Sequence, residues 1–182
     1  MSTITTTNPA TGETLATYPL MSEHDAVEKL EAAHEAFHDW KALSHADRAP
    51  YLKAIAEKLR ENADELSELM TRETGKLLKD GQREIEICSA IFEYTAQNGP
   101  DVLADEERKH GKNQARGIVS HQPIGVIYSI QPWNFPLYQP VRVLAANLMA
   151  GNACVLKHAS ICTGSGLRLR ELCIEAGLPE DL

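Results

Sequence analysis

The sequence predicts an α/β protein in which an amino-terminal β-hairpin and several helices precede the start of a doubly wound parallel sheet. Three observations support this class. Residues 1–20 are Thr-rich around an Asn-Pro-Ala-Thr-Gly-Glu turn, residues 21–117 show helical periodicity, and residues 118–182 alternate between strand and helix patterns. We expect these parts to be an extended hairpin, a helical portion with a polar loop, and the beginning of the sheet.

The first two predicted helices begin at capping residues. Ser22 and Asp25 form a capping-box pattern, so the first helix is expected to start there. Its predicted apolar stripe consists of Val27, Leu30, Phe37 and Trp40. We expect the second helix to start at Asp47 rather than Ser44, because this choice leaves Pro50 in the first turn, where a missing N–H costs little.

Two more helices complete the middle part. The third is expected from about Asp64 to a stop at Gly75. The fourth covers roughly Lys79 to Gln97, and the Asn-Gly-Pro sequence at 98–100 is expected to end it. Its predicted inward side chains are Ile85, Cys88 and Phe92. We assign these helices to a solvated shell without chemistry, followed by a polar loop over Asp105–Asn113.

The last part reads as strands separated by helices. Strands are predicted at 117–121, 125–130 and 153–157, and helices at 137–150 and 163–176. The run at 125–130 is nearly all apolar, which is typical of a strand covered on both faces. Gly151 and Gly177 are expected to close the two helices. This order predicts parallel strands joined by right-handed crossovers.

Charge is distributed unevenly along the chain. Its 182 residues include 18 Lys and Arg and 26 Asp and Glu, which gives a net charge of −8. The segment 118–161 holds no acid and two bases, Arg142 and Lys157, so we expect it to be buried. Because burying an unpaired cation is costly, either acids from elsewhere pair with these side chains or an anionic ligand does.

Several classes of function are disfavoured by composition. The acidity argues against nucleic acid as the main partner. No apolar stretch approaches the ~20 residues of a membrane span, and the start lacks signal-peptide features, so we expect a cytoplasmic protein. The cysteines Cys88, Cys154, Cys162 and Cys173 lack metal-site spacing and are expected to be reduced, buried hydrophobes, with no metal bound. His121 and His158 are isolated and expected to be structural.

The carboxyl ends of the parallel strands are the expected ligand site, here residues 131–134 and 157–160. Pro132 and Pro136 stiffen the first of these loops. Between them, Asn134 offers an uncharged N–H₂ donor that suits an oxyanion developing on a carbonyl substrate. The alternative is that Asn134 closes an Asx turn before the helix, and local sequence alone favours that turn.

The helix between these strand ends carries further candidate groups. Its first amides, near Pro136, can face an anion. Tyr138, Gln139 and Arg142 share one helical face, and Arg142 suits bidentate binding of a carboxylate, unless it forms a structural ion pair with an acid of the earlier helices. Lys157 can reach a ligand hydroxyl or phosphate, unless it extends to the surface.

Several short sequences occur in a familiar order. They are NPATGE at 8–13, ETGK at 73–76, PIGV at 123–126, PWNFP at 132–136, AGN at 150–152 and VLK at 155–157. Over essentially its whole length the chain resembles the amino-terminal half of the NAD(P)-dependent aldehyde dehydrogenase superfamily. The resemblance implies a Rossmann-like fold and oxidation of an aldehyde to its acid through a Cys thiohemiacetal.

The resemblance also implies roles for both strand ends. Asn134 would contribute to the oxyanion hole. The residues implied to contact the nicotinamide side of the cofactor are Ile130, Gln131, Pro132 and Trp133, and Asn134 between the prolines is also implied to bind the cofactor. Those implied to bind the cofactor at the second strand end are Lys157, His158, Ala159 and Ser160, with Lys157 on the adenosine ribose.

Two departures from the family pattern refine this picture. NAD-preferring members usually carry Glu three residues after the lysine, where this chain has Ser160. A carboxylate repels a 2′-phosphate and a serine does not, so we expect NADP to be accepted or preferred over NAD. Arg142 stands where succinate-semialdehyde dehydrogenases place an arginine for the substrate carboxylate. Together with Tyr138 and Gln139, it makes the sequence look most like the bacterial succinate-semialdehyde branch.

The family's nucleophile and general base are missing from this sequence. None of the cysteines lies in the nucleophile sequence, and no ELGG-type sequence is present. We therefore expect a truncated portion that is inactive alone and that, in the complete enzyme, acts on a small aldehyde as a dimer or tetramer. The alternative is a non-catalytic remnant that binds a nucleotide or a partner chain. An acidic four-helix interaction domain is disfavoured by the uncharged segment 118–161.

Overall fold

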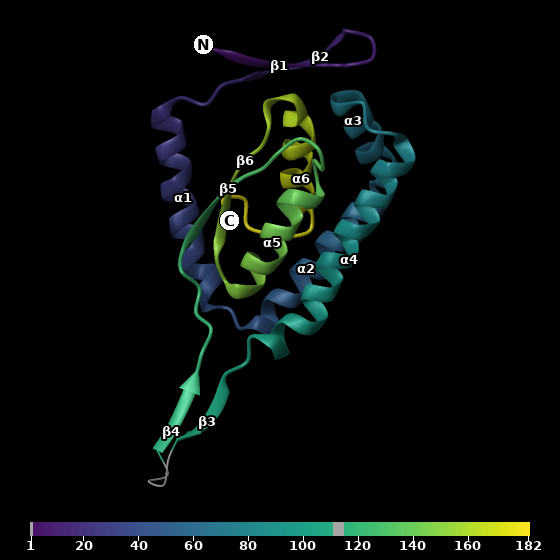
Figure 1. Ribbon diagram of the computed structural model, residues 1–182. Helices are drawn as coiled ribbons and strands as arrows, with labels where there is room; N and C mark the ends of the chain where they lie inside the picture. The colour runs from purple at the N-terminus through teal and green to yellow at the C-terminus, as the bar shows by residue number, and fades with distance from the viewer. Residues whose placement is uncertain (1, 111–114) are drawn as a thin grey trace.

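The computed structural model describes residues 2–110 and 115–182. Its first half contains β1 (Thr3–Thr7), β2 (Thr14–Pro19), α1 (Glu23–Ala42), α2 (His45–Glu61), α3 (Ala63–Thr74) and α4 (Leu78–Val102). Its second half contains β3 (Glu106–His110), β4 (Ala115–Val119), β5 (Val126–Ile130), α5 (Tyr138–Ala150), β6 (Ala153–Lys157), the 3₁₀ turn η1 (Ser160–Cys162) and α6 (Thr163–Glu175). Figure 1 shows this order along the chain.

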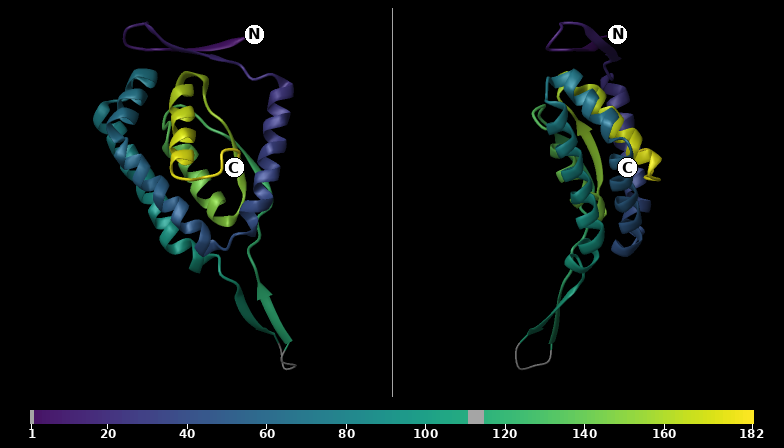
Figure 2. Two further views of the ribbon diagram at one scale, coloured as in Figure 1. Left: turned by 180° about the vertical axis from the view of Figure 1, so that it is seen from behind. Right: turned by 90° about the vertical axis from the view of Figure 1, so that its right-hand side faces the viewer.

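Within the described residues, the strands form three separate pairs. The pairs β1–β2 and β3–β4 are antiparallel, and β5–β6 is parallel, with Val126 opposite Ala153 and Ile130 opposite Lys157. The predicted hairpin and the predicted parallel pair are therefore confirmed. In the right-hand view of Figure 2 the parallel strands lie between α4 and α5 on one side and α1 on the other.

The amino-terminal boundary of α2 differs from the prediction. Ser44, not Asp47, is the N-cap, because its Oγ accepts the Asp47 N–H at 3.1 Å while the Asp47 carboxylate accepts the Ser44 N–H at 3.2 Å. This capping box satisfies two backbone donors at once. Pro50 consequently lies in the second turn, at a solvent-exposed position. The cap predicted for α1 at Ser22 is confirmed.

Helix α4 continues through its predicted stop. It runs past Asn98, Gly99 and Pro100 to Val102. Gly99 packs against α5 so closely that a Cβ there would lie 2.5 Å from Met149 Cγ. The glycine is thus needed for helix packing rather than for termination, and this tertiary contact overrides the local turn signal.

The predicted polar loop over Asp105–Asn113 is wrong in its first part. Strand β3 occupies 106–110 and pairs with β4, and residues 111–113 lie outside the described residues. Glu107 Oε1 and Arg116 Nε, 2.8 Å apart, join the two strands across the pair. Figure 1 shows this ribbon projecting from one end of the molecule. Cross-strand pairing of these charged side chains explains why a polar stretch forms a strand.

The core lies among α2, α3, α4 and α5. Its largest fully buried side chains include Leu52, Ile55, Leu59, Leu66, Met70, Ile85, Phe92, Leu137 and Leu148. The inward placement predicted for α4 is confirmed. The stripe predicted for α1 is wrong at Val27 and Leu30, which are about half exposed, because only the second half of α1 packs inward through Phe37 and Trp40.

Arg48 links the α1–α2 turn to the end of α5 through hydrogen bonds. Its buried guanidinium donates to the carbonyls of Trp40, Lys41, Leu43 and Met149. Four carbonyl acceptors satisfy this cation without a carboxylate. Trp40 adds a second link, because its Nε1–H donates to the Leu148 carbonyl at 2.9 Å. Helix α5 therefore ends at a fixed point, where Gly151 adopts a positive φ of 96° as predicted.

Burial of the uncharged segment 118–161 is confirmed for the inner face of α5, for Leu137 before it and for Ala153 at the start of β6, but not for the whole segment. Along β5, Tyr128 and Ile130 are exposed while Ser129 between them is buried, so this strand is not covered on both faces. Ile124 is 85% exposed. The apolar run of β5 thus has one face that no described element covers. Among the described residues, no helix has both the length and the apolar content that crossing a membrane requires.

Candidate active site at the ends of the parallel strands

The two predicted ligand loops lie side by side. Ile130 and Lys157 are paired in register at the ends of β5 and β6, and the Gln131 N–H donates to the Lys157 carbonyl at 3.1 Å. The loops that leave these strands therefore start from adjacent points, as the parallel arrangement predicts. The Gln131 side chain does not face outward freely, because its Nε2 donates to Ser129 Oγ at 2.6 Å.

A buried carboxylate occupies the amino-terminal end of α5. Glu84 Oε1 accepts the N–H groups of Leu137 and Tyr138 at 2.8 and 2.9 Å, and Glu84 is only 2% exposed. Its other oxygen binds the Lys76 ammonium. The sequence predicted that an anion can face these amides, and the anion is this internal carboxylate. A ligand must accordingly be bound by other groups of the loop.

Lys76 links the same carboxylate to the loop before α5. Its ammonium lies 4.1 Å from the centroid of the Phe135 ring, while it is paired with Glu84. Phe135 is the residue next to Asn134, so this cation–π contact and the ion pair together restrain the loop that carries the predicted oxyanion donor. Glu84 and Lys76 come from α4 and the α3–α4 connection, which the sequence assigned to a shell without chemistry.

His158 joins the two ligand loops. Its Nε2 lies 2.7 Å from the Pro136 carbonyl, and its Nδ1 accepts the Ala159 N–H at 2.8 Å. These partners require a neutral ring with the proton on Nε2. Burial lowers the pKa of His158 in agreement with that state. The ring is held between the loops, so the structure supports the predicted structural role of this histidine.

A hollow of about 690 Å³ opens beside the first loop. It is lined by Trp133, Asn134, Phe135 and Tyr138 from the loop and α5, together with Lys76, Glu84 and Ile87 from the facing side. Asn134 is exposed there, and no hydrogen bond of its side chain is found within the described residues. An Asx turn would use the N–H two residues on, which Pro136 lacks. The amide of Asn134 is therefore available to a ligand.

The two cations of the uncharged segment are also available. Arg142 is exposed, with its guanidinium 5.4 Å from the centroid of the Tyr138 ring, and neither it nor Lys157 forms an ion pair with any described residue. The structural ion pair considered for Arg142 is thus not present in residues 2–110 and 115–182. Lys157 and Ser160 are exposed at the end of β6, Ala159 is half-buried, and Gln139 is half-buried on α5.

A second buried glutamate repeats this design at α6. Glu73 accepts the N–H groups of Gly164 and Ser165 at 2.8 and 2.9 Å, and the Ser165 hydroxyl at 2.7 Å. Sequence reasoning missed both glutamates. The local sequence gives no signal for them, because an acid within a helix of mixed charge is typical of a solvated face.

The cysteines are all held as neutral thiols. Burial raises the pKa of Cys154, Cys162 and Cys173 to about 12, and it also raises that of Cys88. Cys162 Sγ lies 3.3 Å from His158 Nδ1, but that nitrogen already accepts an amide N–H. None of these thiols is therefore prepared as a nucleophile.

Comparison with known proteins decides the family. The model of the aldehyde dehydrogenase family matches residues 1–182. The chain belongs to this family.

Relatives and solved structures support the same assignment. The succinate-semialdehyde dehydrogenase [NADP(+)] of Mycobacterium avium is 42% identical over 179 residues, covering 97% of this chain and 38% of the relative. That of Deinococcus radiodurans is 38% identical over 175 residues, covering 96% of this chain and 36% of the relative. The chain therefore spans little more than a third of the length of these curated relatives.

The fold agrees equally well with crystal structures. The succinic semialdehyde dehydrogenase from Streptococcus pyogenes, solved in complex with NADP⁺, gives a TM-score of 0.92 at 35% identity, with 98% of this chain and 39% of that chain covered. A structure described as an E. coli NADP dependent enzyme gives a TM-score of 0.94 at 36% identity, with coverages of 99% and 37%.

The Glu84–Lys76 pair yields a stability prediction. Replacing Glu84→Gln leaves the Lys76 ammonium without its buried partner, and we expect a loss of about 3–5 kcal/mol in the free energy of unfolding, measured by urea denaturation. The control Glu86→Gln, at an exposed position on the same helix, is expected to cost less than about 1 kcal/mol. In a double-mutant cycle, Lys76→Met should cost less in the Glu84→Gln background than alone; strictly additive losses would contradict the coupling.

Proposed function

We propose that residues 1–182 form the amino-terminal, ligand-recognising part of an NAD(P)-dependent succinate-semialdehyde dehydrogenase. The proposal rests on the surroundings of the Arg142 guanidinium. It is exposed in a segment without acids, forms no ion pair with the described residues, and stacks beside Tyr138, which lines the same hollow as Asn134. A carboxylated aldehyde matches both groups, with its carboxylate on Arg142 and its carbonyl oxygen at Asn134.

Asn134 would act on the reacting carbonyl. Its N–H₂ group is unpaired within the described residues and is held in place by the Glu84, Lys76 and Phe135 contacts. A neutral donor fixed before reaction stabilises an oxygen that becomes negative when the carbonyl is attacked. The proline residues on both sides limit movement of this donor.

The second strand end has features that fit a nicotinamide dinucleotide. Lys157 and Ser160 are exposed, and no acid of the segment 118–161 opposes a phosphate there. Lys157 would bind the adenosine ribose and Ser160 would leave room for a 2′-phosphate, which favours NADP over NAD. When bound, the cofactor supplies the hydride acceptor for aldehyde oxidation. Ile130 and Trp133, both exposed, would contact its nicotinamide side.

We further propose that the complete polypeptide works in the cytoplasm as a dimer or tetramer. Exposed apolar side chains at Ile118, Val119 and Ile124 support an interface along β4 and the segment that follows it. Residues of this kind gather where protein surfaces associate.

The 182-residue chain alone is expected to be inactive. Its cysteines are buried or half-buried thiols with raised pKa values, so no thiolate is present to attack an aldehyde at neutral pH. The purified chain should produce no NADPH from succinate semialdehyde and NADP⁺ in an absorbance assay at 340 nm. Steady NADPH formation would overturn this expectation. Titration with NADP⁺ alone then tests whether the chain serves as a nucleotide-binding module.

Arg142 gives the test of substrate class. In an enzyme of full family length that carries this segment, Arg142→Leu should raise the KM for succinate semialdehyde about 10- to 100-fold, the value of a charge-assisted contact. The KM for an uncharged aldehyde such as hexanal should change less than about twofold, because it has no carboxylate. Arg170→Leu, which removes an exposed arginine paired with Glu180, is the matched control. Equal increases for both aldehydes would remove Arg142 from the site.

Ser160 gives the test of cofactor preference. Ser160→Glu in the same enzyme should lower kcat/KM for NADP⁺ at least tenfold while leaving that for NAD⁺ within about threefold, because a carboxylate repels the 2′-phosphate. Ser160→Gln introduces a side chain of the same size as glutamate but without its charge. This variant should keep the original preference between NADP⁺ and NAD⁺. If the glutamine variant discriminates as strongly as the glutamate variant, size rather than charge governs this position.

A further inference from the structure

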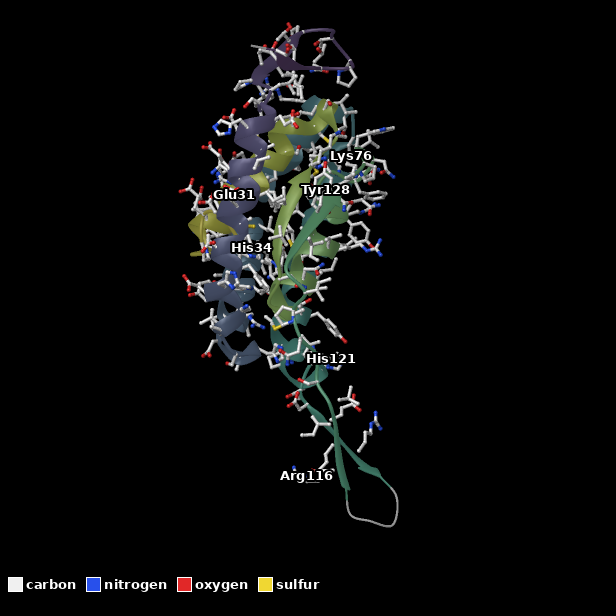
Figure 3. The ribbon with its side chains drawn as sticks, turned by 90° about the vertical axis from the view of Figure 1, so that its left-hand side faces the viewer. Glu31, His34, Lys76, Arg116, His121 and Tyr128 are labelled. Atoms are coloured by element: carbon white, nitrogen blue, oxygen red, sulfur yellow. The ribbon has the colours of Figure 1, made fainter. Side chains whose placement is uncertain are left out.

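A pair of histidines projects from α1 at a separation suited to a metal ion. The Nε2 atoms of His34 and His38 are 3.3 Å apart and share a hydrogen bond, and their ring centroids are 4.7 Å apart with planes inclined at 79°. Both side chains are exposed. Figure 3 shows His34 on α1, one turn from Glu31. None of these residues takes part in the candidate active site.

The distance between the nitrogens matches a chelate. Two imidazole nitrogens bound at 2.0–2.1 Å to one tetrahedral metal ion lie about 3.4 Å apart, and two adjacent ligands of a square or octahedral ion lie about 2.9 Å apart. The observed 3.3 Å falls between these values. Binding a metal ion requires both Nε2 atoms to be unprotonated, so bonds to the ion would replace the hydrogen bond between the rings.

The surroundings favour a cation. Helix α1 carries six acids and two lysines, and Glu31, Glu35 and Asp39 all lie within one turn of the histidine pair. Lys41 is the nearest base on this helix, and its ammonium is directed over the Phe37 ring at 4.9 Å. The acids therefore provide a negative local potential, while the lysine is engaged with an aromatic face.

We propose that His34 and His38 form a two-histidine site for a divalent transition-metal ion on α1. Within residues 2–110 and 115–182, no group of three or more His, Cys, Asp and Glu side chains is arranged to hold a metal, so water completes the coordination. Nitrogen ligands select Cu²⁺, Ni²⁺ or Zn²⁺ over Mg²⁺ and Ca²⁺, in the order Cu²⁺ above Ni²⁺ and Zn²⁺.

Binding at this site stabilises the helix that carries it. The two imidazoles are one turn apart only when α1 is helical, so the ion binds the folded state and adds RT ln(1 + [M]/Kd) to its stability. The second half of α1 holds Phe37 and Trp40 in the core. A metal ion on α1 thus strengthens the packing of this helix against α5 and the parallel strands.

The test uses the tag-free 182-residue chain and Cu²⁺ alone. We expect one Cu²⁺ per chain by isothermal titration, with nitrogen hyperfine structure from two imidazoles in the electron paramagnetic resonance spectrum. His34→Gln and His38→Gln should each weaken binding at least tenfold and remove the two-imidazole signal. Far-UV circular dichroism checks that these exposed substitutions leave the helix content unchanged.

The matched control is His24→Gln. His24 lies on the same helix, is exposed, and is 3.4 Å from Glu28. This variant should bind Cu²⁺ as the unaltered chain does. Undiminished binding in His34→Gln or His38→Gln would overturn the site, as would equal loss in His24→Gln. Neither result bears on the proposed dehydrogenase function, because NADP⁺ titration of the variants measures that separately.

Discussion

The fold depends on two buried carboxylates that hold the starts of the helices following the parallel strands. Glu84 accepts the first amides of α5, and Glu73 accepts those of α6. Burying a charged carboxylate is costly unless hydrogen bonds and opposite charge replace its hydration. Here the helix amides supply the hydrogen bonds and the positive end of the helix dipole, and for Glu84 the Lys76 ammonium adds a full opposite charge. Removing either carboxylate would leave buried amides without acceptors.

This arrangement determines which groups remain for a ligand. In many α/β proteins the helix amino terminus itself binds a phosphate. In this chain the Leu137 and Tyr138 amides are already occupied by Glu84, so recognition falls to side chains. Arg142 and Lys157 form no ion pair within the described residues, and both lie in the segment that contains no acid. Absence of acids in that segment therefore keeps its two cations available.

Local pattern predicted the elements, and long-range packing decided their limits. The hairpin, the α5 boundaries and the parallel pair followed from short periodicities and turn residues. Helix α2 is capped by Ser44 through a capping box. The sequence predicted Asp47 instead, because only the position of Pro50 was considered. The continuation of α4 past Gly99 depended on contact with Met149, which no local pattern contains. Glu73 and Glu84 resembled surface acids of amphipathic helices, and only the partner amides, 91 and 53 residues away in sequence, identify them as buried.

Under the proposed function, binding a ligand and attacking it require different surroundings of a side chain, and the described residues supply groups suited to binding. Asn134, Arg142 and Lys157 are exposed near the two strand ends, where a ligand can reach them. A nucleophilic thiolate needs exposure and a positive environment that lowers its pKa. The cysteines have the reverse properties, since burial raises the pKa of each one. Under the proposed function, aldehyde oxidation would therefore need a thiolate from other residues at the hollow beside Asn134, in a loop that Glu84 and Lys76 restrain.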